Sequence, residues 1–143
     1  MTIAAILGHK GAEVFSVTSD VSLREAIAIL AERRIGAIPV IDGGEVRGIF
    51  SERDAIRLLA AQEAAAVLDA LVGSVMTEPP LTVSPGDSVL AALSLMTHRR
   101  VRHLPVVEDG RVVGIVSIGD LVKYRIDRIE AEAAAMRDYI QQA

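Results

Sequence analysis

The sequence predicts a mixed α/β protein made of two β-α-β-β-α repeats that pack about a pseudo-twofold axis, with a C-terminal helix. The chief observation is internal: at an offset of 66, residues 17–57 align with residues 83–123 without a gap, and a direct count finds 13 identities in 41 positions. Proline, glycine, serine and aspartate recur in register. A hydrophobic content of 51% supplies material for a packed core.

Each repeat has the same predicted order of elements. A short strand around Val17, or around Val83 in the second copy, precedes a helix whose apolar residues recur at helical spacing. Two short strands separated by turn residues follow, at 37–41 and 45–50 or at 103–107 and 111–116, which is typical of a hairpin. Ser51 and Ser117 each open a further helix. The Ala- and Leu-rich linker at 55–71 is predicted to be helical and is broken by residues 73–80.

Composition and charge exclude several classes of protein. The absence of cysteine excludes a disulfide scaffold, a thiolate metal site and a cysteine nucleophile. A net charge of −4 argues against a nucleic-acid binder. No apolar run approaches the roughly 20 residues that span a bilayer, and residues 1–10 lack the basic start of a signal peptide. We therefore expect a cytoplasmic protein with neither a nucleic-acid nor a membrane partner.

The repeat suggests three parts. Residues 1–66 hold the first repeat with an N-terminal segment and the helical linker, residues 67–125 hold the second repeat, and residues 126–143 form an amphipathic helix. A unit of about 60 residues buries too little surface to be comfortably stable alone. Two copies packed together solve that problem and leave clefts between them, with strands at Pro39 and Pro105 interrupted or at an edge because proline lacks an N–H.

The sharpest local signal is a serine that ends a strand and opens a helix, with an aspartate three residues later. It occurs as Ser51 and Asp54, and again as Ser117 and Asp120. One interpretation is a capping box, in which the serine and the carboxylate only satisfy the helix start. The other is a ligand site, in which the helix N-terminus and hydroxyl attract a phosphate and the aspartate accepts hydrogen bonds from a ribose. Both can hold at once.

These residues resemble a known family. The doubled G-x-x-S-x-x-D, the Ile-Pro-Val and Leu-Pro-Val strands and the Val-Met-Thr sequence at 75–77 are similar to a tandem pair of cystathionine-β-synthase-type (CBS) domains, or Bateman module. The resemblance covers residues 2–125, and the second half is close to small free-standing bacterial CBS-pair proteins. It implies that an adenosine-containing ligand binds between the repeats: AMP first, with ADP, ATP, NAD(H) or S-adenosylmethionine as alternatives.

The resemblance also implies which residues line each cleft. In the first cleft, Ser51, Arg53 and Asp54 would face four residues of the second repeat: Thr82, Val83, Val101 and Pro105. In the second cleft, Ser117 and Asp120 would face four residues of the first repeat: Val17, Thr18, Ile35 and Pro39.

The two clefts are not expected to be equal. The first gathers cations from both repeats: Arg53, Arg100, Arg102 and His103. In the second, small residues replace most of them, and Arg34 is the remaining obvious cation. Clustered guanidinium groups favour phosphate, so the Asp54 cleft should bind a phosphate-rich nucleotide more tightly. The alternative is that these arginines form a solvated helix end and that His103 is an ordinary edge residue.

The sequence contains no motif that indicates catalysis. The histidines lack metal-binding spacing, and neither a Ser–His–Asp arrangement nor a phosphate-cradling Gly-rich loop occurs. His9 and Lys10 are expected to be solvated loop residues. We therefore expect a protein that is not an enzyme and requires no metal.

The C-terminal segment carries an apolar stripe at heptad spacing over about three heptads. Its members are Val122, Ile126, Ile129, Ala133, Met136 and Ile140. Such a stripe either packs back on the repeats or seals a dimer, and the family resemblance favours a homodimer.

Three functions compete. The first is a ligand-sensing regulatory module that binds an adenine nucleotide and signals in trans to an effector protein, whose identity the sequence does not give. The second is a structural or adaptor dimer whose serine–aspartate pairs are only caps. The third, an enzyme acting on nucleotides, ranks last because no base or nucleophile accompanies the clefts.

Overall fold

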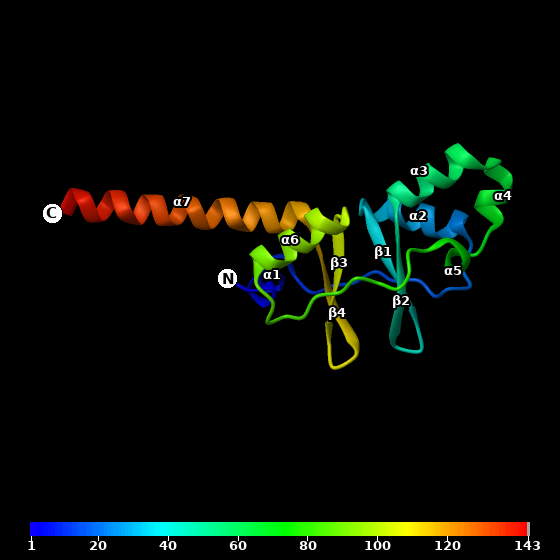
Figure 1. The fold of residues 1–143 in the computed structure, drawn as a ribbon, viewed down its shortest axis with the longest axis horizontal. Helices are drawn as coiled ribbons and strands as arrows, with labels where there is room; N and C mark the ends of the chain where they lie inside the picture. Colours follow the sequence, from blue (N-terminus) through cyan, green and yellow to red (C-terminus); the bar gives the residue numbers. More distant parts are fainter. Residues whose placement is uncertain (143) are drawn as a thin grey trace.

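The computed structural model describes residues 1–142 and confirms the mixed α/β class. The first repeat contains α2 (Leu23–Arg33), β1 (Ala37–Asp42), β2 (Glu45–Ser51) and α3 (Glu52–Ala61). The second contains α6 (Val89–Arg99), β3 (His103–Glu108), β4 (Arg111–Ser117) and α7 (Ile118–Gln142). The remaining helices are α1 (Ile3–Lys10), α4 (Ala64–Asp69) and α5 (Val72–Val75). Figure 1 shows the two hairpins side by side, with α7 projecting far from the body.

The two hairpins are near copies of each other. β1 pairs antiparallel with β2, and β3 with β4, each across a two-residue turn. The turns have positive φ at both central residues: 59° and 82° at Gly43 and Gly44, 53° and 77° at Asp109 and Gly110. This conformation matches the twist of the strands and favours glycine or aspartate, as the sequence has it. The predicted hairpins are confirmed.

The prolines of the hairpins use their carbonyl groups. The backbone N–H of Val17 donates to the carbonyl of Pro39 at 3.1 Å, and that of Val83 donates to Pro105 at 3.0 Å. A proline at these positions therefore costs no ladder hydrogen bond. Val17 and Val83 each form a single parallel bridge to the hairpin, so the predicted first strand of each repeat is reduced to one residue.

The hydrophobic core has two parts, one under each hairpin. The first consists of buried residues of the β1–β2 hairpin, of the helices packed against it and of the bridging valine: Val17, Leu23, Ala26, Leu30, Ile38, Val40, Phe50, Ala55, Val67 and Val72. The second is its counterpart under β3: Ile3, Ile6, Val83, Val89, Ala92, Met96, Leu104, Val106, Val116 and Leu121. Aside from Phe50 the buried residues are aliphatic or methionine, as the low aromatic content requires.

Each repeat borrows a helix from the chain that precedes the other repeat. Ile3 of α1 donates its N–H to the carbonyl of Asp87 at 2.9 Å and packs in the second core. Val72 of α5 donates to Val21 at 2.8 Å and packs in the first core. The N-terminal segment thus completes the second repeat, and the linker completes the first. This exchange ties the two repeats together by the chain itself.

Two helices differ from their predicted bounds. The linker is helical but divided, because α3 ends at Ala61 and α4 begins at Ala64, with extended backbone at Gln62 and Glu63. The C-terminal helix does not begin near residue 126: α7 is continuous from Ile118 to Gln142. Residue 143, the last of the predicted C-terminal part, lies outside the described residues. Across residues 1–142, none of the helices combines the length and the apolar character that crossing a membrane requires.

Candidate functional site

The first cleft is a cavity of about 350 Å³ between the two repeats. Ser51, Arg53 and Asp54 reach it from the start of α3, and Arg100, Val101, Arg102 and His103 reach it from the loop between α6 and β3. Both repeats therefore contribute to one site. Its apolar wall consists of Ala37, Ile49, Val101 and Ile118, which suits a flat hydrophobic ring.

Ser51 and Asp54 form a capping box at the start of α3. The hydroxyl of Ser51 accepts a hydrogen bond from the N–H of Asp54 at 3.2 Å, and Oδ2 of Asp54 accepts from the N–H of Ser51 at 2.9 Å. The Ser51 hydroxyl also donates to Oδ2 at 3.0 Å. The cap thus engages Oδ2, while Oδ1 lies 4.0 Å from the guanidinium of Arg57. Oδ1 remains as an acceptor for a hydroxyl pair, so capping and ligand binding are compatible.

The charge around the first cleft is positive. Four arginines line it, namely Arg53, Arg57, Arg100 and Arg102. Two carboxylates, Glu52 and Asp54, also line it, so the formal balance of these residues is +2 (four minus two). Guanidinium groups bind phosphate oxygens in a bidentate manner, and a cavity that gathers four of them favours an anion.

Arg34 and Arg100 occupy equivalent and unusual backbone positions. Each caps the C-terminus of its helix in the left-handed conformation, with φ of 53° at Arg34 and 54° at Arg100. This position favours glycine, since a Cβ there meets the following carbonyl. Both arginines are exposed and line a cleft, Arg100 the first and Arg34 the second. The same strained turn therefore presents a guanidinium at each cleft.

The second cleft is a further cavity of about 390 Å³, and residues of both repeats line it. The structure brings Ser117 and Asp120 together there with Ile35, as the family resemblance implied, and with Arg34, as the comparison of the repeats suggested. Ser117 and Asp120 also cap their helix: the N–H of Ser117 donates to Oδ2 of Asp120 at 2.8 Å, and the N–H of Asp120 donates to the Ser117 hydroxyl at 3.1 Å. The residues that line this cleft include two cations, Lys10 and Arg34, and two carboxylates, Glu13 and Asp120. The second cleft therefore lacks the excess of positive charge found in the first.

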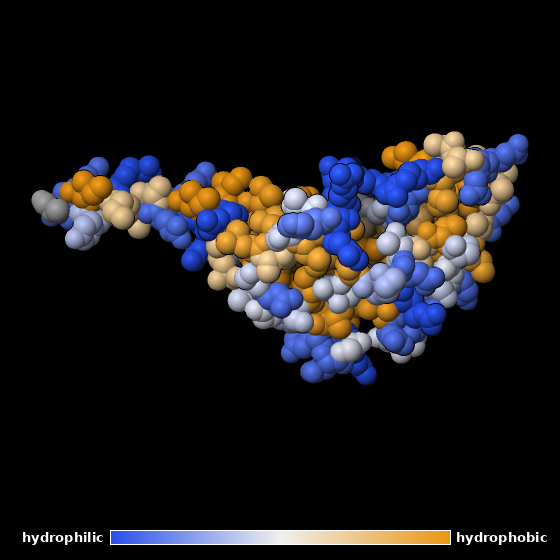
Figure 2. Space-filling model, in the orientation of Figure 1, coloured by the Kyte–Doolittle hydropathy of each residue, from blue (hydrophilic) through white to orange (hydrophobic). Residues whose placement is uncertain are grey.

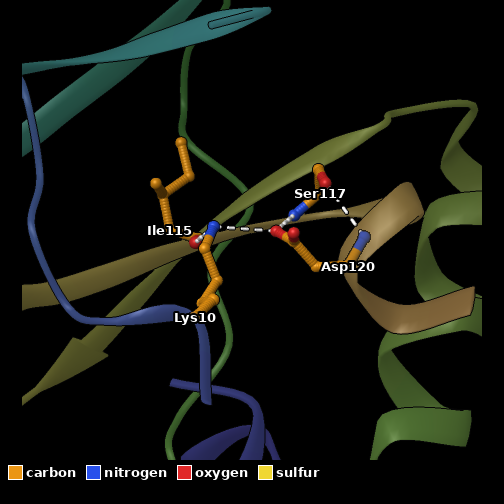
Figure 3. A network of polar contacts seen from close by, with 4 residues as sticks. All are labelled: Lys10, Ile115, Ser117 and Asp120. Carbon is orange, nitrogen blue, oxygen red and sulfur yellow. Dashed lines mark hydrogen bonds and ion pairs between the residues drawn. The ribbon is translucent and has the colours of Figure 1, made fainter. Parts of the chain in front are cut away.

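Lys10 belongs to this cleft, which corrects the expectation of a solvated loop residue. Its ammonium donates to Oδ2 of Asp120 and to the carbonyl of Ile115, both at 2.8 Å (Figure 3). Burial raises the pKa of Asp120, but the hydrogen bonds from Lys10 and Ser117 outweigh it and hold that pKa below its ordinary value. The carboxylate of the second cleft is therefore ionised and already paired.

The reason for the asymmetry is the length of α1. Ile3 occupies the place of Val72, and Leu7 contacts Gly114 as Met76 contacts Gly48, so these helices align at an offset of 69 (72 minus 3, 76 minus 7). The repeats themselves align at 66, which leaves three additional residues between Leu7 and Val17, and α1 continues to Lys10 whereas α5 ends at Val75. Lys10 lies in this extension, so the comparison of repeats offered no partner for it. A lysine at the end of a helix gave no sequence signal of its own.

His103 forms a wall shared by both clefts. It lines the first and the second cavity, together with Gly36, Ala37 and Ser117. Gly36 makes room for it, since a Cβ on Gly36 would lie 2.9 Å from Cε1 of the imidazole ring. Burial lowers the pKa of His103, and the carboxylates of Glu52 and Asp120 offset this only in part. The ring is therefore neutral at pH 7 and lies between the two clefts.

Several predicted site residues do not line either cavity. Pro39 and Pro105 are buried within β1 and β3, and Val17 and Val83 are buried beside those strands, where the backbone groups of all four form the bridges described above. Thr18 and Thr82 are exposed outside the cavities, and the Thr18 hydroxyl donates to Asp20. Their expected contacts with a ligand remain predictions.

Other residues reach the clefts without having been predicted. Ile49, Thr77 and Arg57 line the first, and Phe15 and Glu13 line the second. Thr77 is placed by a reciprocal pair of backbone hydrogen bonds with Ile49, at 2.9 and 3.1 Å. Phe15 stands beneath the guanidinium of Arg33, whose Cζ lies 4.3 Å from the ring centroid. Among residues 1–142, no group of three or more histidine, aspartate or glutamate side chains is placed to hold a metal ion.

A fold of two intertwined hairpin repeats with paired clefts defines a tandem-domain module. The chain matches the CBS domain twice, over residues 11–61 and 72–127, and the protein belongs to the CBS-domain family as a pair of such domains. It is 34% identical over 149 residues to CBSX3, a mitochondrial CBS domain-containing protein of Arabidopsis thaliana, with 98% of this chain and 72% of that protein covered.

Solved structures show the same pair. The CBS-domain protein ATU1752 of Agrobacterium tumefaciens is 41% identical, with a TM-score of 0.83, covering 87% of this chain and 92% of that one. The CBS domain pair of MJ0100, solved in complex with 5′-methylthioadenosine and S-adenosyl-L-methionine, is 25% identical with a TM-score of 0.77. That alignment covers 90% of this chain and 98% of that one.

Proposed function

We propose that the protein is a regulatory module that binds an adenine nucleotide in the first cleft. The observation that carries the proposal is the convergence of Ser51 and Asp54 from one repeat with Arg100, Arg102 and His103 from the other around one cavity. The similar pair of MJ0100, crystallised with adenosine-containing ligands, supports the ligand class. We expect AMP as the main ligand, with ADP, ATP, NAD(H) and S-adenosylmethionine as alternatives, and no metal.

Each part of such a ligand meets matching chemistry in the first cleft. Oδ1 of Asp54 would accept hydrogen bonds from the ribose hydroxyls, because the cap engages Oδ2. The apolar surface of Ile49 and Val101 would cover the adenine, and the arginines would neutralise the phosphate. The second cleft, where Lys10 pairs with Asp120, would take a nucleotide more weakly.

The regulatory step follows from the position of the ligand between the repeats. A nucleotide that touches both repeats binds best in one relative placement of the two, and it shifts the population towards that placement. An effector protein then responds in trans to this change of placement, and the module itself only binds the nucleotide.

Thermal unfolding with each nucleotide tests the proposal. At about 100 times its dissociation constant, a ligand stabilises the folded state by roughly 2.7 kcal/mol, which raises the Tm by several degrees. Asp54→Asn should remove most of this shift and Asp120→Asn less of it. Each shift is measured from the variant's own unliganded Tm, because loss of a cap costs about 1 kcal/mol by itself.

Asp109→Asn is the matched control, since Asp109 lies in an exposed hairpin turn where asparagine also accepts a positive φ. It should respond to nucleotide like the parent. An equal response of the Asp54 and Asp109 variants would refute the assignment of the site. If no nucleotide shifts the parent protein, the module is a structural adaptor and its serine–aspartate pairs are caps alone.

A further inference from the structure

The outer part of α7 has no tertiary partner within the described chain. Leu121 is buried in the second core and Tyr124 packs against it, but residues 126–142 are exposed except for half-buried Ala134. Figure 1 shows this part projecting away from the body as a single shaft. Most helical stability in proteins comes from packing of an apolar face, and this part of α7 has no such packing within the described chain. The shaft therefore needs a partner.

The exposed shaft carries a continuous apolar stripe. Its large members are 42% exposed at Val122, 49% at Ile126, 48% at Ile129, 59% at Met136 and 64% at Ile140. Figure 2 shows hydrophobic patches along this helix. Together with Ala133, these residues are spaced by 4, 3, 4, 3 and 4. This spacing puts Ile126, Ala133 and Ile140 at a positions of a heptad and Val122, Ile129 and Met136 at d positions.

The charges beside the stripe identify the partner and its direction. The g positions hold Arg125 and Glu132, and the e positions of the next heptad hold Glu130 and Arg137. In a parallel pair of identical helices, each g residue faces the e′ residue five positions later. Arg125 then faces Glu130′ and Glu132 faces Arg137′, and the twofold axis repeats both pairs. All four contacts join opposite charges.

The antiparallel arrangement lacks this complementarity. There, g faces g′ and e faces e′. With the stripes in register about residue 131, Glu130 meets Glu130′ and Glu132 meets Glu132′. Within one chain, Glu132 reaches only Arg128, at 3.9 Å and with both side chains more than half exposed. We propose that α7 forms a parallel two-stranded coiled coil with α7 of a second copy of this chain. The proposal stands independently of nucleotide binding.

The absence of native cysteine allows a direct test of partner and direction. Ile140→Cys places a thiol at an a position near the C-terminal end, where a parallel pair brings 140 next to 140′. Mild oxidation of the full-length variant should yield a covalent dimer that runs at twice the chain mass on a non-reducing gel. In an antiparallel pair, residue 140 lies beside 122′, and no such disulfide forms. Gln141→Cys, on the outward face, is the matched control and should remain monomeric on the gel.

Sedimentation equilibrium of the full chain supplies the second measurement. The parent should have the mass of two chains, and Ile126→Lys with Ile129→Lys should have the mass of one, because both side chains are exposed and their replacement leaves the core intact. Ala131→Lys, on the opposite face, should remain dimeric. Glu132→Arg should weaken the dimer, and Glu132→Arg with Arg137→Glu should restore it.

Three results would overturn the proposal. These are a parent protein that sediments as a monomer, a dimer unaffected by the lysine substitutions, and a disulfide yield at Gln141→Cys equal to that at Ile140→Cys. The second result would place the dimer interface on the body of the repeats instead of α7. A covalent Ile140→Cys dimer together with loss of nucleotide binding would still support the coiled coil and count only against the proposed function.

Discussion

At the scale of single residues, Arg100 is a position where a substitution is expected to change stability and ligand affinity in opposite directions. Arg100 holds a left-handed backbone at φ 54° and lines the first cleft. A non-glycine residue at a position that favours glycine leads us to expect a function that glycine would lose, and in this cleft the expected function is to present a cation. The identical turn at Arg34 supplies an internal comparison in the second cleft.

Arg100→Gly should therefore raise stability and lower affinity at the same time. Glycine accepts the left-handed conformation freely, so the free energy of unfolding should rise by about 1 kcal/mol. The dissociation constant for AMP should increase at least about tenfold, the effect of one charge-assisted phosphate contact. Urea denaturation and calorimetric titration measure the two quantities. Arg34→Gly should stabilise equally with little effect on AMP, and an unchanged AMP affinity in Arg100→Gly would show that Arg100 is only a solvated helix end.

In the second cleft, Lys10 occupies the Asp120 carboxylate that a ligand would need. Because its ammonium holds Asp120, Lys10→Met should free that carboxylate for a ribose. In an Asp54→Asn background, which silences the first cleft, affinity for adenosine should rise about two- to fivefold, corresponding to a partly exposed ion pair. Isothermal titration measures this, with Lys123→Met as the control. A weaker affinity in Lys10→Met would instead identify Lys10 as a direct ligand contact.

The same pair has a defined pH dependence. The pKa of Asp120 lies below the ordinary 3.8, so its pairing contributes stability above that pH and loses it as the pH falls through the folded-state pKa. The difference in stability between the parent and Lys10→Met should therefore be constant near pH 7 and shrink below about pH 4.

At the scale of elements, α1 is part of the second repeat's core although it precedes the first repeat in the chain. Ile3 is fully buried among residues of the second core. The sequence analysis grouped the N-terminal segment with the first repeat, because the order of the chain does not reveal which repeat an apolar segment covers. That choice depends on backbone hydrogen bonds to residues more than 80 positions away, such as the bond from Ile3 to Asp87.

Ile3→Ala tests this packing. Removing a fully buried isoleucine side chain should cost about 2–5 kcal/mol of unfolding free energy. The matched control is Ile56→Ala, because Ile56 is 67% exposed and its truncation should cost under about 0.5 kcal/mol. Urea denaturation at neutral pH measures both. Equal losses in the two variants would contradict the placement of α1 in the second core.

At the scale of the whole molecule, the two clefts share one wall. His103, Gly36, Ala37 and Ser117 line both cavities, so a ligand in one cleft rests against the residues that bound the other. The exchange of α1 and α5 between the repeats also resists their separation. A nucleotide bound between the repeats, as proposed above, would therefore act on a tightly connected pair, and a parallel α7 coiled coil would join two such pairs at their C-terminal ends.

The sequence by itself determined the repeat, the hairpins with their turns, the serine–aspartate caps and the cluster of cations expected at the first cleft. These features depend on local patterns: positive φ in a two-residue turn, the capping spacing, and heptads in α7. Only the tertiary structure decided that α1 packs in the second repeat, that Lys10 pairs with Asp120, and that the predicted valines and prolines are buried outside the clefts. These outcomes arise from packing between distant segments. The longer connection between Leu7 and Val17 changes which side chain reaches a cleft, and no local sequence pattern shows this.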